Sequence, residues 1–215
     1  MLSSLLLIAA AQLATAHFGI EYPPWRADTL ADEENSPYSQ WEYPCAGVPA
    51  GTGNRTDWPL TGGSVSLDLH HKWTYVFINV GLGDNVTNFN ISLTPEFWNV
   101  TGNGTFCIPT LPLPATVQDG QNATIQVVTS GQSGSALYNC ADITFRSAAK
   151  SLSGDECKNT TASAVTIGQS HSTSNSSSST NSTSSGGTNS ATGISANFVA
   201  LTSISGLAVL FALGL

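Results

Sequence analysis

Short alternating runs of apolar and polar residues, with no long amphipathic stretch, characterise the middle of this chain. In the segment 64–69, SVSLDL, this alternation places Val65, Leu67 and Leu69 on one side, as in a strand with one buried face. The segment 74–82, TYVFINVGL, is a continuous apolar run and predicts a buried strand. The segment 74–82 is also rich in the β-branched and aromatic residues that favour extended backbone.

Three further segments have the length and composition of strands: 104–109, 123–128 and 136–145. The last two are separated by TSGQSGS, whose glycines and serines predict a hairpin. Glycine, proline and asparagine interrupt the sequence between the candidate strands. Several short strands in one domain of ordinary size predict an all-β fold, an antiparallel β-sandwich.

The two ends of the chain have the composition of targeting segments. An apolar run and a small-x-small pattern ending at Ala16 predict a secretory signal peptide that is removed by cleavage. The apolar segment 197–215 carries no charge and follows small residues, as in a signal for a glycosylphosphatidylinositol (GPI) lipid anchor. A C-terminal transmembrane helix is the alternative. The candidate attachment residues are Ser185, Gly186, Gly187, Asn189 and Ser190.

These patterns divide the chain into a signal peptide, 1–16, a β domain, 17–157, a stalk, 158–193, and an anchor signal, 194–215. The stalk consists mainly of Ser, Thr, Asn and Gly, a composition too polar to form a core, so we expect it to be disordered and glycosylated. The expected location is the secretory pathway and then the outer face of the plasma membrane and the cell wall. The candidate N-glycosylation sites are Asn54, Asn85, Asn90, Asn99, Asn103, Asn122, Asn159, Asn175 and Asn181.

Charge and cysteine content narrow the possible partners. A formal net charge of −8 argues against nucleic acid and anionic membrane surfaces. An even number of cysteines in an oxidising compartment predicts two disulfides, and the sequence leaves their pairing open. The absence of a C-x-x-C pair makes a cysteine metal site the weaker reading. The cysteines are Cys45, Cys107, Cys140 and Cys157.

Cleavage after Ala16 would make His17 the first residue of the mature chain. Such a residue offers its α-amine and its imidazole to one metal ion, and a second histidine would complete a three-nitrogen site called a histidine brace. Nitrogen ligands of this kind suit Cu(II). The pair His70 and His71 follows the candidate strand 64–69, and strand phase favours His71 as the second ligand over His70.

A carboxylate is the next candidate ligand. Asp142 lies two residues from Cys140 on a candidate strand, where a buried acid requires a partner that a metal could provide. Asp119 is the competitor, although Asp-Gly is common in turns, and Asp68 is a weaker third choice. The sequence contains no G-x-S-x-G, H-E-x-x-H or glycine-rich phosphate-binding pattern.

Five blocks, HFGIEYPPWR, PLTGGSVSLDLHHKWTYVFINVGLG, FCIPTLP, NATIQVV and LYNCADITF, occur in order between His17 and Phe145. Together they resemble fungal copper-binding proteins that are similar to lytic polysaccharide monooxygenases and are grouped with the copper acquisition factor. The resemblance implies an immunoglobulin-like β-sandwich. It also implies one Cu(II) per chain, bound by His17, by His70 or His71, and by an aspartate, matched by Asp142 with Asp119 in reserve.

Members of this family are tied to copper acquisition at the cell surface and to cell-wall processes, without oxidative cleavage of polysaccharide. The resemblance therefore implies a non-enzymatic copper-binding protein, with a plasma-membrane copper importer and cell-wall polysaccharide as partners. One alternative is a copper monooxygenase that acts on cell-wall glucan or chitin, for which tryptophans that do not pack in the core would supply a sugar-stacking surface. The other is a structural cell-wall glycoprotein whose histidines have no role in metal binding.

Overall fold

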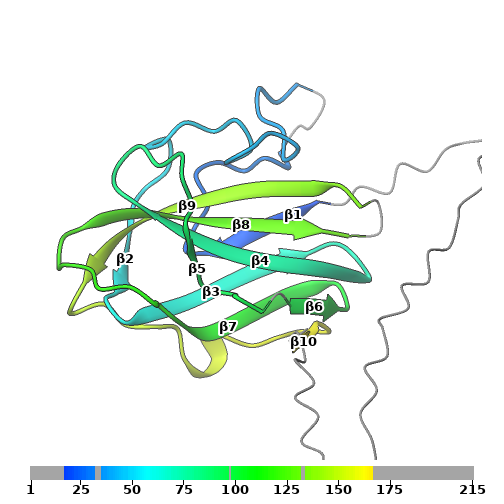
Figure 1. Ribbon diagram of the computed structural model, residues 1–215. Coiled ribbons are helices and arrows are strands. Elements are labelled where there is room, and N and C mark those ends of the chain that lie inside the picture. Colours follow the sequence, from blue (N-terminus) through cyan, green and yellow to red (C-terminus); the bar gives the residue numbers. More distant parts are fainter. Residues whose placement is uncertain (1–16, 32–34, 97, 132–133, 167–215) are drawn as a thin grey trace, which may run out of the picture. The chain divides into compact units, whose positions relative to one another are not determined.

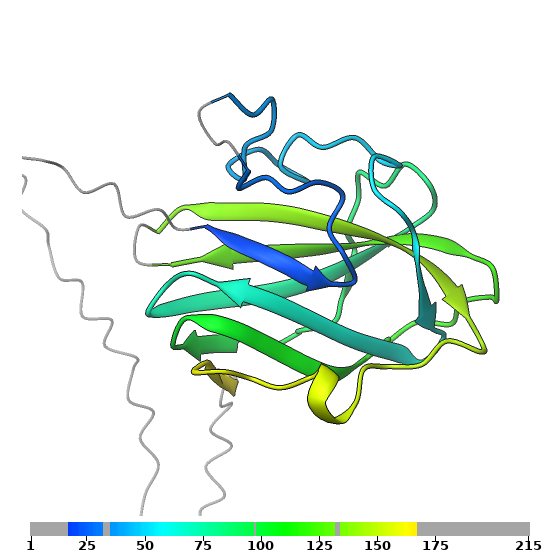
Figure 2. The same cartoon turned by 180° about the vertical axis from the view of Figure 1, so that it is seen from behind.

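Two β-sheets packed face to face form the fold in this computed structural model, which describes residues 17–31, 35–96, 98–131 and 134–166 (Figures 1 and 2). One sheet has the strand order β1-β3-β7, and the other has the order β10-β6-β4-β8-β9-β2, with β5 paired to β4. The described residues contain no α-helix, only one 3₁₀ turn, η1 (Gly154–Glu156). No helix in this part of the chain is long and apolar enough to cross a membrane.

The strands are numbered in the order in which they occur along the chain. They are β1 (Phe18–Tyr22), β2 (Thr56–Pro59), β3 (Gly62–Leu69), β4 (Trp73–Leu82), β5 (Ile91–Ser92), β6 (Trp98–Thr101), β7 (Gly104–Pro112), β8 (Asn122–Ser130), β9 (Ala136–Arg146) and β10 (Ser163–Thr166). The predicted all-β sandwich and the hairpin of β8 and β9 are confirmed. Every pair is antiparallel in these described strands except β2 with β9, which run parallel.

The core lies between the sheets and consists of the inward side chains of both. Val65, Leu67 and Leu69 of β3 are at most 1 % exposed, as the alternation predicted. The strand β4 differs from the prediction, because its apolar run alternates between buried and half-buried positions. Val76 and Ile78 face the core, whereas the residues between them lie on the outer face, where large side chains keep part of their surface in solvent.

Two disulfides join segments distant in sequence and confirm the predicted number. Cys45–Cys140 ties the long segment between β1 and β2 to β9. Cys107–Cys157 ties β7 to the chain that precedes β10. The described residues contain no free cysteine. The first disulfide fixes a segment with little regular structure of its own along the outer side of β9.

The ordered fold extends beyond the predicted end of the domain at Cys157. Residues 163–166, assigned from their composition to the disordered stalk, form β10 and pair with β6. Asn159 accepts a hydrogen bond from the backbone N–H of Cys107 through Oδ1 (2.7 Å). Backbone pairing to an existing sheet edge orders this polar segment despite its small apolar content. The segment predicted as a signal peptide, the rest of the predicted stalk with His171, and the predicted anchor signal lie outside the described residues.

Candidate metal site

Three histidines lie at one end of the sandwich. His17 directly precedes β1, and Phe18 pairs with Leu69 of β3, so His17 and His70 occupy the next positions across the two strands. His70 and His71 lie in the short connection between β3 and β4. Figures 1 and 2 both show the start of β1, this connection, the end of β8 and the start of β9 at the same end of the sandwich. The fold therefore gathers the three predicted histidines.

The His70 ring is held by a neighbouring carboxylate. Nε2 of His70 lies 2.9 Å from Oδ2 of Asp68. A carboxylate oxygen accepts hydrogen bonds, so the contact is a hydrogen bond in the tautomer of His70 that carries its hydrogen on Nε2. The ring remains 42 % exposed. Asp68 and His70 are two residues apart, and this contact occupies Nε2 of His70.

The His71 ring lies deeper in the fold. Its Nε2 atom is buried. A Cβ placed on Gly131, the residue after β8, would lie 3.2 Å from Cδ2 of His71. The ring therefore packs directly against the Gly131 backbone, and the absence of a side chain there makes room for it. Because β3 and β8 belong to different sheets, His71 bridges the end of the sandwich.

Asp142 is not brought to the histidines. Asn139 and Asp142 are three residues apart in β9, whose pairing with β8 is continuous, so their side chains point to opposite faces. Nδ2 of Asn139 donates to the backbone oxygen of Phe18 (3.1 Å), on the side that faces β1. Asp142 lies on the other side, beneath the segment that carries Arg26. The sheet thus separates Asp142 from His17.

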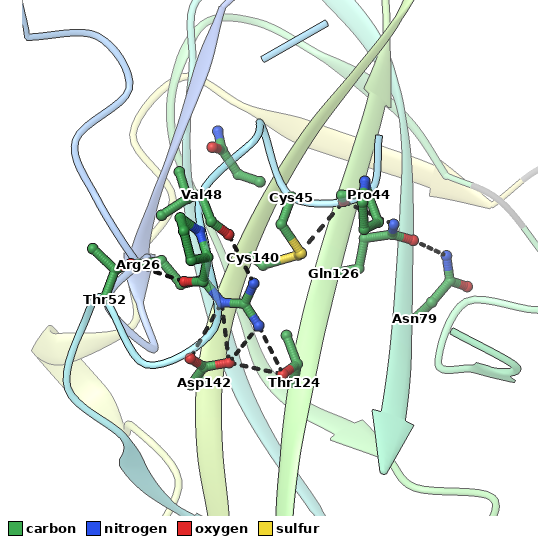
Figure 3. The surroundings of a disulfide bond; sticks show 12 residues. Arg26, Pro44, Cys45, Val48, Thr52, Asn79, Thr124, Gln126, Cys140 and Asp142 are labelled. Carbon is green, nitrogen blue, oxygen red and sulfur yellow. Dashed lines mark hydrogen bonds and ion pairs between the residues drawn. A yellow bond between two sulfur atoms is a disulfide. The ribbon is translucent and has the colours of Figure 1, made fainter. Parts of the chain in front are cut away.

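The partner that Asp142 requires is Arg26 (Figure 3). Nη2 of Arg26 donates to Oδ1 of Asp142 (2.8 Å), and the hydroxyl of Thr124 donates to the same oxygen (2.7 Å). The backbone N–H of Gly51 donates to Oδ2 (3.1 Å). Burial opposes the charge of Asp142, but the hydrogen bonds from Arg26, Thr124 and Gly51 and the charge of Arg26 hold its pKa below the ordinary value. The carboxylate of Asp142 is therefore occupied by its contacts with Arg26, Thr124 and Gly51.

Asp119 lies at the other end of the sandwich. Its Oδ1 accepts a hydrogen bond from the backbone N–H of Ser147, just past the end of β9. Hydrogen bonds from Ser147, together with the nearby charge of Arg146, lower its pKa, although its slight burial acts in the opposite direction. The eleven residues of β9 span about 33 Å, so this end is far from the histidines. The structure does not bring Asp119 and the histidines together.

Sequence reasoning missed a buried polar group beside His17. The amide of Gln40 bonds to both backbone polar groups of Phe18: Oε1 accepts from the N–H (3.2 Å), and Nε2 donates to the oxygen (2.9 Å). Gln40 lies in a loop of polar and aromatic residues, where composition gives no sign of burial. Trp41 next to it is 49 % exposed and Tyr43 is 60 % exposed. These two side chains form an exposed aromatic surface close to Gln40 in the sequence.

The candidate glycosylation sites differ in exposure. Asn122 is half-buried, and its side chain bonds to Asp84 and Thr144. Asn99 is also half-buried. Asn175 and Asn181 lie outside the described residues. The remaining candidate sites are exposed: Asn54, Asn85, Asn90, Asn103 and Asn159.

The donor set at the histidine end fits a copper ion. Among residues 17–31, 35–96, 98–131 and 134–166, no group of three or more His, Cys, Asp or Glu side chains is placed to hold a metal. A histidine brace requires only two side chains, because its third donor is the main-chain amine of the first residue. His17 with His70 or His71 provides this number, and imidazole nitrogen suits Cu(II).

Comparison with known proteins identifies relatives of the whole β domain. The profile of the family described as copper acquisition factor BIM1-like matches residues 15–162. The lytic polysaccharide monooxygenase-like protein ham-7 of Neurospora crassa is 40 % identical over 160 residues, which are 66 % of this chain and 69 % of the relative. The lytic polysaccharide monooxygenase-like protein X325 of Aspergillus fumigatus is 35 % identical over 199 residues, 78 % of this chain and 82 % of the relative.

A more distant relative is the copper acquisition factor BIM1 of Cryptococcus neoformans. It is 27 % identical over 168 residues, which are 70 % of each chain. The matched span 15–162 runs from just before His17 through both disulfides and ends one residue before β10. The chain therefore belongs to the BIM1-like copper acquisition factor family.

Proposed function

We propose that the mature protein binds one Cu(II) ion at the cell surface and serves in copper acquisition. The α-amine and imidazole of His17 and the imidazole of His71 are the proposed ligands. The observation that carries this proposal is the β1–β3 register, which sets His17 beside the connection that contains His70 and His71. Membership of the BIM1-like family supports copper as the metal.

The chemistry of the donors supports Cu(II). An α-amine has a reference pKa of about 7.7 to 8.0, so it gives up its proton to a metal at neutral pH far more readily than a lysine does. Cu(II) forms the most stable complexes of the divalent first-row metals with nitrogen ligands. The ion, when bound, would be cargo for transfer. In this proposal the residues of this chain bind the copper ion and do not use it for chemistry.

His71 is preferred to His70 because of how each ring is held. The buried Nε2 of His71 belongs to a ring that packing against Gly131 keeps in one orientation, which favours a pre-organised ligand. The Nε2 of His70 is already occupied by Asp68. The proposed ligand set contains neither Asp142 nor Asp119, since one is paired with Arg26 across the sheet and the other lies at the far end.

The cell-surface role rests on the predicted targeting segments. A cleaved signal peptide is required to expose the amine of His17, and a GPI anchor would keep the bound copper at the cell's own membrane. A plasma-membrane copper importer is the proposed recipient. The Cryptococcus relative is named as a copper acquisition factor, which agrees with this role. Polysaccharide cleavage forms no part of the proposal.

The test is electron paramagnetic resonance of the mature protein with one equivalent of Cu(II). Mass spectrometry first verifies that the chain begins at His17. We expect an axial signal with resolved nitrogen couplings, which is lost when one alanine precedes His17. His71→Ala should abolish the signal, and His70→Ala is the matched control that should retain it. A spectrum of weakly bound copper in the wild type would overturn the proposal.

A second candidate function is copper-dependent oxidation of cell-wall glucan or chitin. The exposed Trp41 and Tyr43 favour it, because aromatic faces stack on sugars and these residues follow Gln40, which contacts Phe18. Incubation of the copper-loaded protein with each polymer and a reductant distinguishes the candidates. Release of oxidised oligosaccharides that requires both copper and reductant would establish the enzyme.

A further inference from the structure

The backbone of Phe18 is held by a closed network of buried side chains. The carboxamide of Gln40 binds its N–H and its oxygen at 3.2 and 2.9 Å, and Nδ2 of Asn139 donates to the same oxygen at 3.1 Å. Nε2 of Gln40 also donates to the hydroxyl of Thr29 (2.8 Å), which donates to Oδ1 of Asn139 (3.2 Å). All three side chains are at most 3 % exposed.

The donors and acceptors that meet in this network satisfy one another. Both N–H bonds of the Gln40 amide are used, its oxygen accepts from Phe18, and the hydroxyl of Thr29 both accepts and donates. The backbone oxygen of Phe18 accepts two hydrogen bonds, one for each lone pair. A satisfied network of this kind fixes its members in one arrangement.

The network holds the start of the proposed mature chain, where the backbone of a protein is ordinarily poorly ordered. β1 is an edge strand of five residues, and Phe18 would be the second residue of the mature protein. The first residues of a domain fray unless they are held. The pairing of β1 with β3 holds one edge of the strand, and the side chains of Gln40 and Asn139 hold the other at Phe18.

The hydrogen bonds of Gln40 to Phe18 are not needed to attach the loop between β1 and β2 to the rest of the fold. The segment between β1 and β2 is already joined to β9 by the Cys45–Cys140 disulfide and by the ion pair of Arg26 with Asp142. The additional hydrogen bonds of Gln40 and Asn139 bind the backbone of Phe18, the residue next to His17. A ligand set that includes the α-amine requires this residue to have a fixed position.

We infer that Gln40, supported by Thr29 and Asn139, is a positioning residue that holds His17 in place for metal binding. This inference rests on the proposed function. The expected contribution is the 10- to 100-fold in metal affinity that outer-shell hydrogen-bonding partners typically provide. It acts through the backbone of Phe18, and none of the three side chains is itself a proposed ligand.

The test compares Gln40→Met with the wild type in the mature protein. Methionine has a similar volume but cannot form the hydrogen bonds. We expect the Cu(II) dissociation constant to rise about 10- to 100-fold and the nitrogen couplings of the resonance spectrum to broaden. Thr94→Val is the matched control: Thr94 is 3 % exposed, and its hydroxyl accepts a hydrogen bond from the N–H of Ile78 (2.9 Å) in the other sheet. It should lower thermal stability and leave the copper spectrum unchanged.

Thr29→Val provides a milder variant, should Gln40→Met fail to fold, and it should weaken copper binding several-fold. Unchanged affinity and spectrum in the folded Gln40 or Thr29 variant, with normal binding by the wild type, would overturn the positioning role alone. Failure of the wild type to bind copper tightly would overturn the proposed function and the positioning role with it. The wild-type measurement therefore separates the two failures.

Discussion

Arg26 and Asp142 form a buried ion pair that joins the segment after β1 to the outer face of β9. Nη2 of Arg26 lies 2.8 Å from Oδ1 of Asp142, and the two side chains are 4 % and 0 % exposed. Nη1 of Arg26 also donates to the backbone oxygen of Val48 (3.0 Å). The pair thus holds in place the loop that also carries Gln40. The charges of Arg26 and Asp142 compensate each other within the protein.

Asp142→Ala should therefore destabilise the fold without changing copper binding. Removal of one partner leaves the charge of Arg26 buried, and such a loss typically costs about 3 to 5 kcal/mol. Urea unfolding measures this loss, and copper titration of the folded variant measures the second expectation. The double variant Arg26→Met with Asp142→Leu removes both charges and should recover part of the stability. A copper spectrum altered by Asp142→Ala would contradict this account and restore Asp142 as a candidate ligand.

Acid should weaken the fold through the same carboxylate. The folded protein holds the pKa of Asp142 below its ordinary value of 3.8, so between the two values the unfolded chain binds more protons. Stability is then fully present above about pH 5 and is lost as the pH falls through the folded pKa. Asp119, whose pKa is also lowered, acts in the same direction.

The measurement is the free energy of unfolding in urea from about pH 6 to pH 2. Asp142→Asn is the control, because its amide does not titrate and its curve should be flatter below pH 4 than that of the wild type. Equal slopes for the two proteins would contradict the assignment of this acid sensitivity to Asp142.

Local patterns in the sequence predicted the longer strands and the place of His70 and His71, because both depend on neighbours in the chain. The shorter strands were not predicted: β1, β2, β5, β6 and β10. Val65 and Leu67 face the core as alternation requires, and His70 and His71 follow directly from the end of β3. The partners of buried polar groups could not be predicted in this way. Arg26 is 116 residues from Asp142, and Gln40 lies in a loop with no periodic pattern, so neither contact leaves a local signal.

The end of the domain could not be predicted from composition either. The segment that contains β10 is rich in Ser and Thr, and its order comes from pairing with β6 and from the contacts of Asn159 and Thr160 with β7. Low apolar content signals disorder only where no sheet edge is available. Asp68, the weakest of the three aspartate candidates, contacts His70, and strand phase alone does not show which acids have other partners.

Glycosylation should differ between two of the candidate asparagines. Asn103 is exposed in the turn between β6 and β7, flanked by Gly102 and Gly104 with φ values of 93° and 102°. Nδ2 of Asn122 donates to Asp84 at 2.7 Å, and its oxygen accepts from Thr144 at 2.7 Å. A glycan on Asn122 would disturb these contacts.

Mass spectrometry of peptides from the secreted protein, after enzymatic release of N-glycans in heavy-oxygen water, measures occupancy at each site. We expect modification at Asn103 and an unmodified Asn122. Full occupancy of Asn122 in a protein of wild-type stability would show that its hydrogen bonds do not constrain glycosylation.

Gly131→Ala should perturb the copper site while the sandwich stays folded. The new Cβ would lie 3.2 Å from Cδ2 and 3.5 Å from Nε2 of His71, so the ring must shift by a few tenths of an ångström. A displaced ligand should change the copper hyperfine coupling and weaken binding. Gly134→Ala in the same connection meets no atom within 4 Å but has a φ of +75°, so it should cost about 1 kcal/mol of stability from backbone strain alone. Identical copper spectra for the two variants would contradict the assignment of His71 as the ligand, because only Gly131→Ala reaches its ring.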